Sequence, residues 1–589
     1  MNVLKVLVTG ALLAPFTTIA AAPASDDVIV VTATRSETAI RDVIVPVTVI
    51  NRQQIEQSAA SDLSELLRFE AGLDIGRNGG PGQATSVFLR GTESNHTLVL
   101  VDGVRVNPGT IGGAALQNIA PEVIERIEIV KGARSSLYGT DAIGGVINII
   151  TRRAGDGYAE AGVGGGSFAT RSGYTSFGAS SDEGEFGVTL NWQDTDGYAI
   201  RTDSDIERGY DNLSINVYGD RQVGPATVGL RHWQASGTNE YLDFFLTPVD
   251  QAFRNQTSAL SIENPLGSRA QSKLLLSYTV DDIDQNQAED FVTSKRLALD
   301  WQYSLQLENH ALAGGFFAAN EDAEALSFGS GFDEGTRTRA LFVQDSYSNG
   351  RHRLFAAGRY TDHETFGNEL TWNAEYAFDL TEQWSLSAGL GHAFRAPDAT
   401  DRFGFGGNTD LRPEVSDEIQ VAARFSPTAR QTLRLELYRN DIDDLIEFDI
   451  STFMLRNISK AEIRGAQLGW QYRGDTFNVR TDLVSQRAEN AADGRLLLRR
   501  PERSMTVNIT KELGEHSLGL SVLASSERED FNGSLPGYVL VNLTGQLKLN
   551  QQWQLNGRIE NLLDTDYQTA APYAMQSISG FVELKYRWQ

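Results

Sequence analysis

Residues 185–193 read EFGVTLNWQ, a stretch in which apolar and polar side chains alternate with a period of two. In an extended chain, one face of this stretch carries large apolar residues and the other carries polar residues and glycine. The same alternation returns in residues 384–394 (WSLSAGLGHAF) and 582–588 (VELKYRW). It continues from about residue 156 to residue 589, so most of the 589-residue chain is predicted to form strands of one kind.

Strands of this kind occur in soluble β-sandwiches and in membrane-spanning β-barrels. A sandwich usually ends after about seven to nine strands, whereas this region has room for roughly twenty spanning strands of about ten residues each. A basic side chain on the lipid face costs ~2–4 kcal/mol at mid-membrane, so Lys585 and Arg587 are predicted to face the lumen and Trp588 to face lipid. We therefore expect residues 156–589 to form an all-β transmembrane barrel.

The N-terminus has the features of an export signal. Lys5 precedes the largely apolar residues 6–16, and residues 22–24 (APA) offer small side chains for cleavage. The alternative, a buried N-terminal helix, fits the small-residue tail poorly. No later apolar run reaches the ~18 residues that a membrane-spanning helix needs. Residues 1–24 are therefore predicted to be a signal peptide, and the exported chain to be periplasmic, secreted or a barrel.

Residues 36–155 have the pattern of a compact mixed α/β domain. Asp62 precedes three leucines at helical spacing and predicts a short capped helix that Gly72 closes. The predicted strands are residues 98–101 (LVLV), 124–130 (IERIEIV) and 146–150 (VINII), with a turn at Asp102 and Gly103. The largest barrels are plugged, so we predict that this domain is a plug inside the lumen.

Composition excludes several functions. The chain has 77 acidic and 51 basic residues, whereas a nucleic-acid partner would require a basic surface. The chain has no cysteine, which excludes disulfides, thiolate metal sites and thiol nucleophiles. Its seven histidines are scattered, and no dinucleotide or phosphate-loop motif is complete. We predict that the protein is not an enzyme and requires no cofactor.

Motifs along the whole mature chain resemble those of the TonB-dependent outer-membrane receptors. In the first domain they are DVIVVTA (27–33), RGT (90–92), LVLVDGVR (98–105), IERIEIVKG (124–132), SLYG (136–139) and GGVINII (144–150). In the second region they are FRAP (394–397), NTDLRPE (408–414), NISKAEIRG (457–465) and NLLDTDY (561–567). Ala133, where the family often has proline, and the terminal Gln589 depart from the pattern. The resemblance implies a plugged barrel of about 22 antiparallel strands in the bacterial outer membrane.

Residues 25–35 include a segment that resembles a TonB box, namely Asp27, Val28, Ile29, Val30, Val31, Thr32 and Ala33. A flexible segment rich in valine and isoleucine can add as a strand to the edge of a partner through main-chain hydrogen bonds. The alternative is a strand docked on the plug itself. The resemblance implies that the partner is TonB, with its inner-membrane energising complex.

Within the family the chain is most similar to the cobalamin (vitamin B12) receptors, which implies a corrinoid ligand. The positions that match ligand contacts are Ala84, Thr85, Ser86, Val87, Phe88, Glu93, Ile111, Gly112, Tyr241, Arg499 and Phe531. Residues 78–82 (NGGPG) either allow a bulky ligand to approach the backbone or form an ordinary turn. A ferric siderophore is the alternative ligand. The alternatives from another class are a passive porin, which needs neither plug nor TonB box, and an outer-membrane enzyme, for which the sequence has no catalytic constellation.

Asp243 and Asp250 match acidic positions of a calcium-dependent cobalamin site. Hard cations require several oxygen ligands, yet the acidic element expected upstream is replaced by residues 206–211 (IERGYD), and Ala199 follows Gly197 and Tyr198. Calcium is therefore a candidate ion and not a required cofactor. We expect the receptor to be a monomer surrounded by outer-membrane lipid.

Overall fold

The computed structural model describes residues 30–31, 35, 38–155, 157–458, 460–531 and 533–588. The predicted signal peptide and part of the TonB-box segment, Asp27, Val28, Ile29, Thr32 and Ala33, lie outside the described residues. Val30–Val31 forms β1, which pairs with β2 (Thr38–Ala39) in an antiparallel sheet of two strands. The backbone of these two valines is thus docked on a strand of its own chain.

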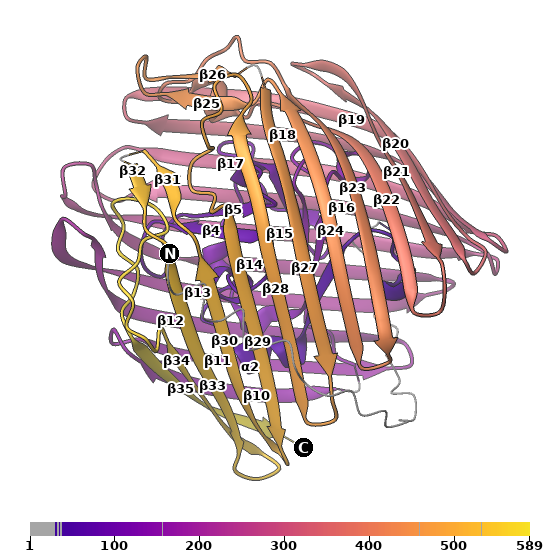
Figure 1. Cartoon of the computed structure of the whole chain (residues 1–589), viewed down its shortest axis with the longest axis horizontal. Coiled ribbons are helices and arrows are strands. Elements are labelled where there is room, and N and C mark those ends of the chain that lie inside the picture. Colours follow the sequence, from indigo (N-terminus) through magenta and orange to yellow (C-terminus); the bar gives the residue numbers. More distant parts are fainter. Residues whose placement is uncertain are drawn as a thin grey trace.

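Twenty-two antiparallel strands form a closed barrel (Figure 1). They are β10 (Tyr158–Gly166), β11 (Arg171–Ser181), β12 (Gly184–Arg201), β13 (Ser204–Val223), β14 (Ala226–Leu242), β15 (Pro248–Leu266), β16 (Ala270–Gln285), β17 (Phe291–Gln306), β18 (His310–Ser327), β19 (Ser330–Ser348), β20 (His352–His363), β21 (Gly367–Asp379), β22 (Trp384–Arg395), β23 (Glu414–Thr428), β24 (Gln431–Asp443), β27 (Lys460–Arg473), β28 (Phe477–Asn490), β29 (Arg503–Leu513), β30 (His516–Ser525), β33 (Tyr538–Lys548), β34 (Trp553–Glu560) and β35 (Ser579–Trp588). The last strand pairs with the first, Trp588 opposite Ala159. The predicted barrel and its strand number are confirmed.

Short turns and longer loops alternate around the barrel. The long connections 396–413, 491–502 and 561–578 lie at one end, and short turns such as residues 182–183 lie at the other. Outer-membrane barrels have short periplasmic turns and longer extracellular loops, which assigns the long connections to the extracellular side. These loops carry α5 (Ala399–Phe403) and the hairpins of β25 (Ile446–Asp449) with β26 (Met454–Asn457) and β31 (Arg528–Asp530) with β32 (Gly533–Leu535).

The wall of the barrel is apolar outside and polar inside. On β35, Trp588 is 53% exposed, whereas Lys585 is 2% exposed and forms ion pairs with Glu56 of the plug and Glu160 of β10, at 3.0 and 2.9 Å. Arg587 pairs with the same two carboxylates. The facing predicted for the last strand is therefore confirmed.

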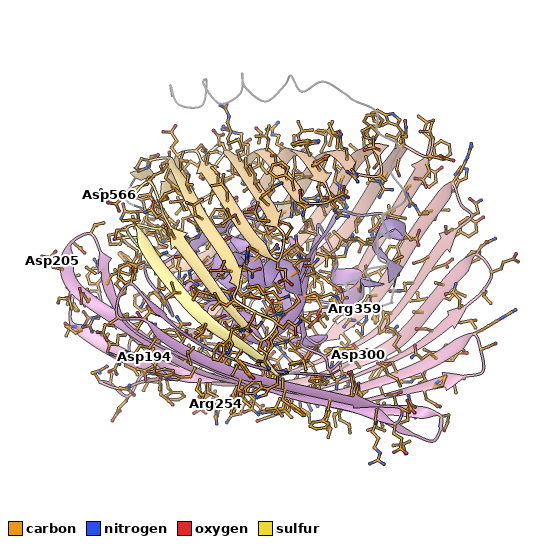
Figure 2. All side chains as sticks on the ribbon, turned by 90° about the horizontal axis from the view of Figure 1, so that it is seen from below. Asp194, Asp205, Arg254, Asp300, Arg359 and Asp566 are labelled. Carbon is orange, nitrogen blue, oxygen red and sulfur yellow. The ribbon has the colours of Figure 1, made fainter. Side chains whose placement is uncertain are left out.

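The plug fills the lumen (Figure 2). Its main sheet has the order β3 (Val47–Asn51), β8 (Ile124–Lys131), β9 (Gly145–Thr151), β6 (Thr97–Val101) and β7 (Val104–Arg105), and a second sheet pairs β4 (Leu73–Arg77) with β5 (Thr85–Leu89). Its helices are η1 (Ile40–Asp42), α2 (Arg52–Ser58), α3 (Leu63–Leu67), η2 (Ser94–His96), η3 (Leu116–Asn118), η4 (Pro121–Val123) and α4 (Ser135–Tyr138). In the part of the chain that the structure describes, no helix is long and apolar enough to span a membrane.

The predicted cap, strands and turn of the plug are confirmed, but the helix that was expected to close at Gly72 ends at Leu67. The Asp62 carboxylate accepts a hydrogen bond from the Glu65 amide at 3.0 Å and caps α3. The three predicted strands correspond to β6, β8 and β9, and Asp102 and Gly103 turn with positive φ of 50° and 82°. Leucine and isoleucine side chains from these elements form the apolar core of the plug.

Buried ion pairs join the plug to the barrel. Arg90 contacts Glu418 at 3.2 Å and Glu436 at 2.9 Å, and all three side chains are 3–4% exposed. Elsewhere Arg134 pairs with Glu375 at 2.6 Å, and the His96 ring contacts Glu414 at 3.0 Å. Acidic side chains of β21, β23 and β24 therefore help to position the plug in the lumen.

Candidate ligand-binding site

Two of the predicted ligand residues meet at the extracellular loops. The Arg499 guanidinium lies 5.6 Å from the centroid of the Phe531 ring, and its Nε donates to Asp530 Oδ1 at 3.1 Å. The buried Asp530 also accepts a hydrogen bond from the Ala571 amide at 2.6 Å. Ala571 belongs to a third loop, so this hydrogen bond holds Asp530 in place, and Asp530 in turn orients the Arg499 guanidinium. The Phe531 ring stays half exposed.

The predicted plug segment divides into exposed and buried members. Ala84 is exposed, and Thr85 and Ser86 of β5 are partly exposed. Val87 lies in the apolar core of the plug and is 3% exposed, so its side chain presents no surface to a ligand here. Phe88 is also buried. The accessible part of the segment is therefore its N-terminal half.

Arg500, which the sequence analysis did not single out, connects the plug positions to the barrel. Its guanidinium lies 4.4 Å from the centroid of the Phe88 ring, and its Nη2 contacts the Glu93 carboxylate at 2.5 Å. Its Nε donates to the Gly91 carbonyl at 3.2 Å. Arg500 could have been noticed in the sequence because it directly follows Arg499. In the structure Arg499 contacts the loop residues Asp530 and Phe531, whereas Arg500 contacts the plug.

The predicted residues Ile111 and Gly112 lie on the plug loop between β7 and η3. Ile111 is 47% exposed and offers an apolar contact. Gly112 has a φ of +66°, and a Cβ there would lie 3.0 Å from Asp398 Oδ2 and from the Asn95 Cβ. Only glycine fits this conformation without strain, so the plug loop passes directly against the barrel loop that carries Asp398.

Tyr241, Asp243 and Asp250 lie at the extracellular hairpin of β14 and β15. The Tyr241 hydroxyl donates to Gln285 Oε1 at 2.6 Å. Asp243 Oδ1 accepts from two amides of its own turn at 2.7 and 2.8 Å, and Asp250 Oδ1 accepts from Gln287 Nε2 at 2.8 Å.

Asp243 and Asp250 are the two carboxylates that the sequence offers as calcium ligands. Calcium takes about six to eight oxygen ligands, and within the described ranges no group of three or more His, Asp or Glu side chains is placed to hold a metal ion. No transport step proposed below depends on calcium. Calcium dependence stays a prediction, which a chelator titration of ligand binding would test.

Arg35, which follows the predicted TonB box, is anchored between plug and barrel. Its Nη1 donates to the Leu137 carbonyl at 2.7 Å, its Nη2 pairs with Asp300 of β17, and its guanidinium lies 4.3 Å from the centroid of the Phe342 ring. The Gln302 amide donates to the Arg35 carbonyl at 2.9 Å. Displacement of the segment by a partner would therefore act directly on the barrel wall.

Comparisons with known proteins agree with this architecture. Residues 39–146 match the family model for the TonB-dependent Receptor Plug Domain, and residues 135–562 match the TonB dependent receptor-like, beta-barrel model. The chain is 30% identical over 606 residues to the vitamin B12 transporter BtuB of Photobacterium profundum, and the alignment covers 98% of each chain.

Solved structures share the fold at lower identity. The siderophore receptor PirA from Acinetobacter baumannii is 17% identical with a TM-score of 0.80, and the match covers 92% of this chain and 98% of PirA. The copper transporter OprC is 16% identical with a TM-score of 0.79 and the same coverage. With both domain models matched in order along a 22-stranded plugged barrel, this outer-membrane protein belongs to the TonB-dependent receptor family.

Proposed function

We propose that this receptor actively imports cobalamin or a related corrinoid across the bacterial outer membrane, with energy delivered by TonB. The observation that carries the proposal is the 30% identity to a vitamin B12 transporter over 98% of both chains. The solved structures select no ligand, because at 16–17% identity they share only the fold.

The chemistry of the site supports a large ligand with both apolar and polar groups. Ligand sites combine apolar and aromatic surface with a few fixed polar groups. Here the Phe531 ring and Ile111 offer apolar surface, and Arg499 offers donors that Asp530 holds in place. We propose that these residues, with Ala84, Thr85 and Ser86 of the plug, contact the corrinoid.

The proposed coupling segment is residues 25–35. It follows a proposed signal peptide (1–24) and precedes the plug (36–155), which is followed by the barrel (156–589). β1 lies in a sheet of two strands, so one of its edges has no strand partner within the described residues. An unpaired strand edge can accept a further strand. TonB would add at this edge and, by pulling, displace Arg35 from the barrel wall.

Direct binding tests the proposed ligand. Purified receptor is titrated with cyanocobalamin and, separately, with a panel of ferric siderophores, and each siderophore then competes with cyanocobalamin at equal concentration. We expect saturable cyanocobalamin binding that siderophores do not displace. A siderophore that displaces cyanocobalamin would overturn the corrinoid proposal and leave the importer class intact.

A further inference from the structure

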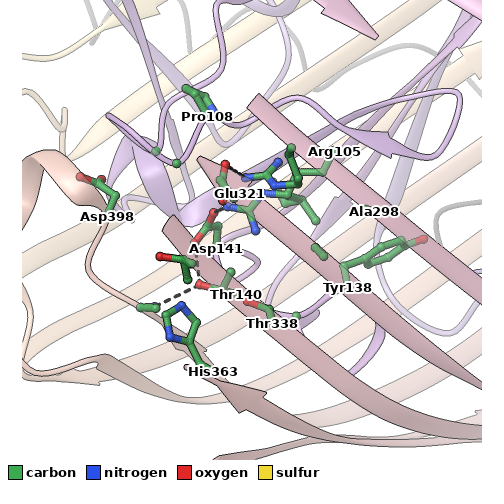
Figure 3. A pocket seen from close by; sticks show the side chains of 18 of the residues that line it. Arg105, Pro108, Tyr138, Thr140, Asp141, Ala298, Glu321, Thr338, His363 and Asp398 are labelled. Carbon is green, nitrogen blue, oxygen red and sulfur yellow. Dashed lines mark hydrogen bonds and ion pairs between the residues drawn. The ribbon is translucent and has the colours of Figure 1, made fainter. Parts of the chain in front are cut away.

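A cavity of about 150 Å³ lies between the plug and the wall formed by β16 to β20 (Figure 3). Phe366 and Phe403 line its extracellular end, and Arg35 and Arg359 line it farther down. Gly112, one of the predicted ligand positions, lines the cavity, whereas Arg499, Phe531 and Tyr241 do not, so the cavity adjoins the loop site proposed for the corrinoid and extends away from it.

Most of the arginines that line this cavity are neutralised by carboxylates that line it too. The pairs are Arg35 with Asp300, Arg105 with Asp141, Arg296 with Glu321 at 2.5 Å, and Arg395 with Asp398 at 2.7 Å. In Figure 3, Arg105, Asp141 and Glu321 cluster on one side of the cavity. Because these charges compensate one another, they leave little affinity for an added ion.

Arg359 of β20 and Arg402 of α5 differ, because none of the described residues forms an ion pair with them, and of the two Arg359 is the buried one. Its side chain is 2% exposed, its Nε donates to Thr361 Oγ1 at 3.2 Å, and its guanidinium lies 5.1 Å from the centroid of the Phe317 ring. Its Nη1 has no hydrogen-bond partner among the described residues. A buried cation without a counter-ion costs several kcal/mol, and guanidinium donors match the geometry of phosphate and carboxylate oxygens.

The surroundings of Arg359 leave access for such an anion. Thr338 and Thr361 also line the cavity, and their hydroxyls can donate to an oxyanion, whereas the Thr140 hydroxyl already donates to Asp141 Oδ1. Gly139 of the plug, with a φ of +89°, passes the guanidinium so closely that a Cβ would lie 3.3 Å from Arg359 Nη2. The plug therefore covers this arginine with backbone and not with a competing acidic side chain.

The position of Arg359 places it partway through the lumen. His363, Thr361 and Arg359 are successive cavity-lining residues of β20, and at about 3.3 Å per residue Arg359 lies about 13 Å from His363 along the strand, toward the periplasmic end. Arg35, the last residue of the predicted coupling segment, lines the same cavity. An anion at Arg359 would thus lie between the extracellular mouth and the contact that TonB is proposed to disturb.

We propose that Arg359 and the neighbouring hydroxyls form an oxyanion subsite in the lumen, which takes a phosphate diester group carried by the transported ligand. The assignment of the phosphate group to the transported ligand rests on the proposed function. The subsite itself follows from the unpaired buried arginine in the cavity. It provides an intermediate position for the ligand between the extracellular loops and the periplasm.

Anion titration of the purified full-length receptor tests the subsite. Inorganic phosphate and dimethyl phosphate are added at constant ionic strength, and binding is followed by 31P line broadening. We expect saturable binding of both anions, at least a tenfold weaker affinity in Arg359→Gln, and retention in Arg359→Lys. The matched control is Arg254→Gln, which removes a more exposed arginine paired with Asp282 on β15 and β16.

A second variant keeps the test valid if Arg359→Gln does not fold. Thr361→Asp places a carboxylate beside the guanidinium, so it should neutralise the buried charge, preserve the barrel and abolish phosphate binding. Absence of saturable binding in the wild type, or unchanged binding in both variants, would overturn the subsite. If the receptor binds inorganic phosphate but not dimethyl phosphate, the proposal that the subsite takes a phosphate diester of the transported ligand would be overturned. Failure of cyanocobalamin binding in the parallel loop-site titration would overturn only the corrinoid proposal.

Discussion

Arg90 provides the sharpest test of how the plug is held. Its two Nη atoms contact Glu418 and Glu436 of adjacent barrel strands, and it lies 4.6 Å from the centroid of the Tyr438 ring. Arg90→Met keeps much of the side-chain volume and removes the charge. Both glutamates then remain buried, although Glu418 keeps a hydrogen bond from the Ala133 amide at 2.6 Å and Glu436 keeps a contact with Arg434 at 3.5 Å. We predict that the plug opens more readily in this variant.

The expected magnitude follows from burial. Removal of one partner from a buried ion pair costs about 3–5 kcal/mol, because the other charge is left uncompensated. Arg221→Met is the matched control, since the Arg221–Glu183 pair has a similar distance of 3.2 Å but side chains 74% and 78% exposed. Exposed pairs contribute about 0–1 kcal/mol. The two variants should therefore differ by several kcal/mol.

Hydrogen exchange measures the effect locally. The opening free energy of amides in β8 and β9 is obtained by mass spectrometry for each variant. We expect it to fall by about 3–5 kcal/mol in Arg90→Met, and to recover in the triple variant with Glu418→Gln and Glu436→Gln, where the two former partners of Arg90 are neutral as well. A decrease in Arg90→Met no larger than that in Arg221→Met would refute the reasoning.

Four further predictions concern coupling, pH, lipid contact and ligand. Val30→Pro should abolish uptake and leave ligand binding intact, because proline removes a strand N–H; normal uptake of labelled ligand would contradict the coupling role. Burial raises the pKa of Asp74 to about 6, so the stabilising contribution of the protonated carboxyl is present below the unfolded pKa and is lost as pH rises through 6. Asp74→Asn should therefore stabilise the plug by up to about 3 kcal/mol at pH 8 and by little at pH 4. An equal gain in opening free energy at both pH values, measured by hydrogen exchange, would contradict this prediction. Leu435→Arg on the lipid face should cost ~2–4 kcal/mol of barrel stability, measured by refolding into lipid vesicles, whereas an equal loss in Leu435→Ala would point to packing instead. Arg499→Ala should weaken corrinoid binding by about 1–2 kcal/mol, and an unchanged affinity would remove this residue from the site.

The barrel could be predicted because its evidence is local. Alternation along a strand determines which side chains meet lipid, and the cost of a charge in lipid places Lys585 in the lumen. The acid that Lys585 meets could not be predicted in the same way. Glu56 lies in a plug helix far away in the chain, and no short-range pattern states which plug residue packs against which strand. The length suggested roughly twenty strands, and the resemblance supplied the number 22.

The site was less predictable for a related reason. A matched position states which residue occurs there but not how its side chain turns. Val87 and Phe88 were expected to face the ligand, yet β5 packs one side chain into the plug core and the other under Arg500. Arg499 and Arg500 have the same chemistry, and only the fold determines which of them contacts the plug.

The distribution of contacts around the plug also suggests how it moves. On one side, Tyr210, Trp233 and Phe253 of β13, β14 and β15 belong to the same apolar cluster as the plug core. On the other side the plug contributes only a few apolar side chains, Ala133, Ile143 and Leu137, to clusters with the wall, and buried ion pairs such as those of Arg90 and Arg134 lie among them. Apolar burial is stabilising in proportion to area, whereas water that enters an ion-paired interface rehydrates the charges and offsets much of the lost attraction. Under a pull at the N-terminal segment, we therefore expect the ion-paired side to separate first while the plug stays attached at β13 to β15.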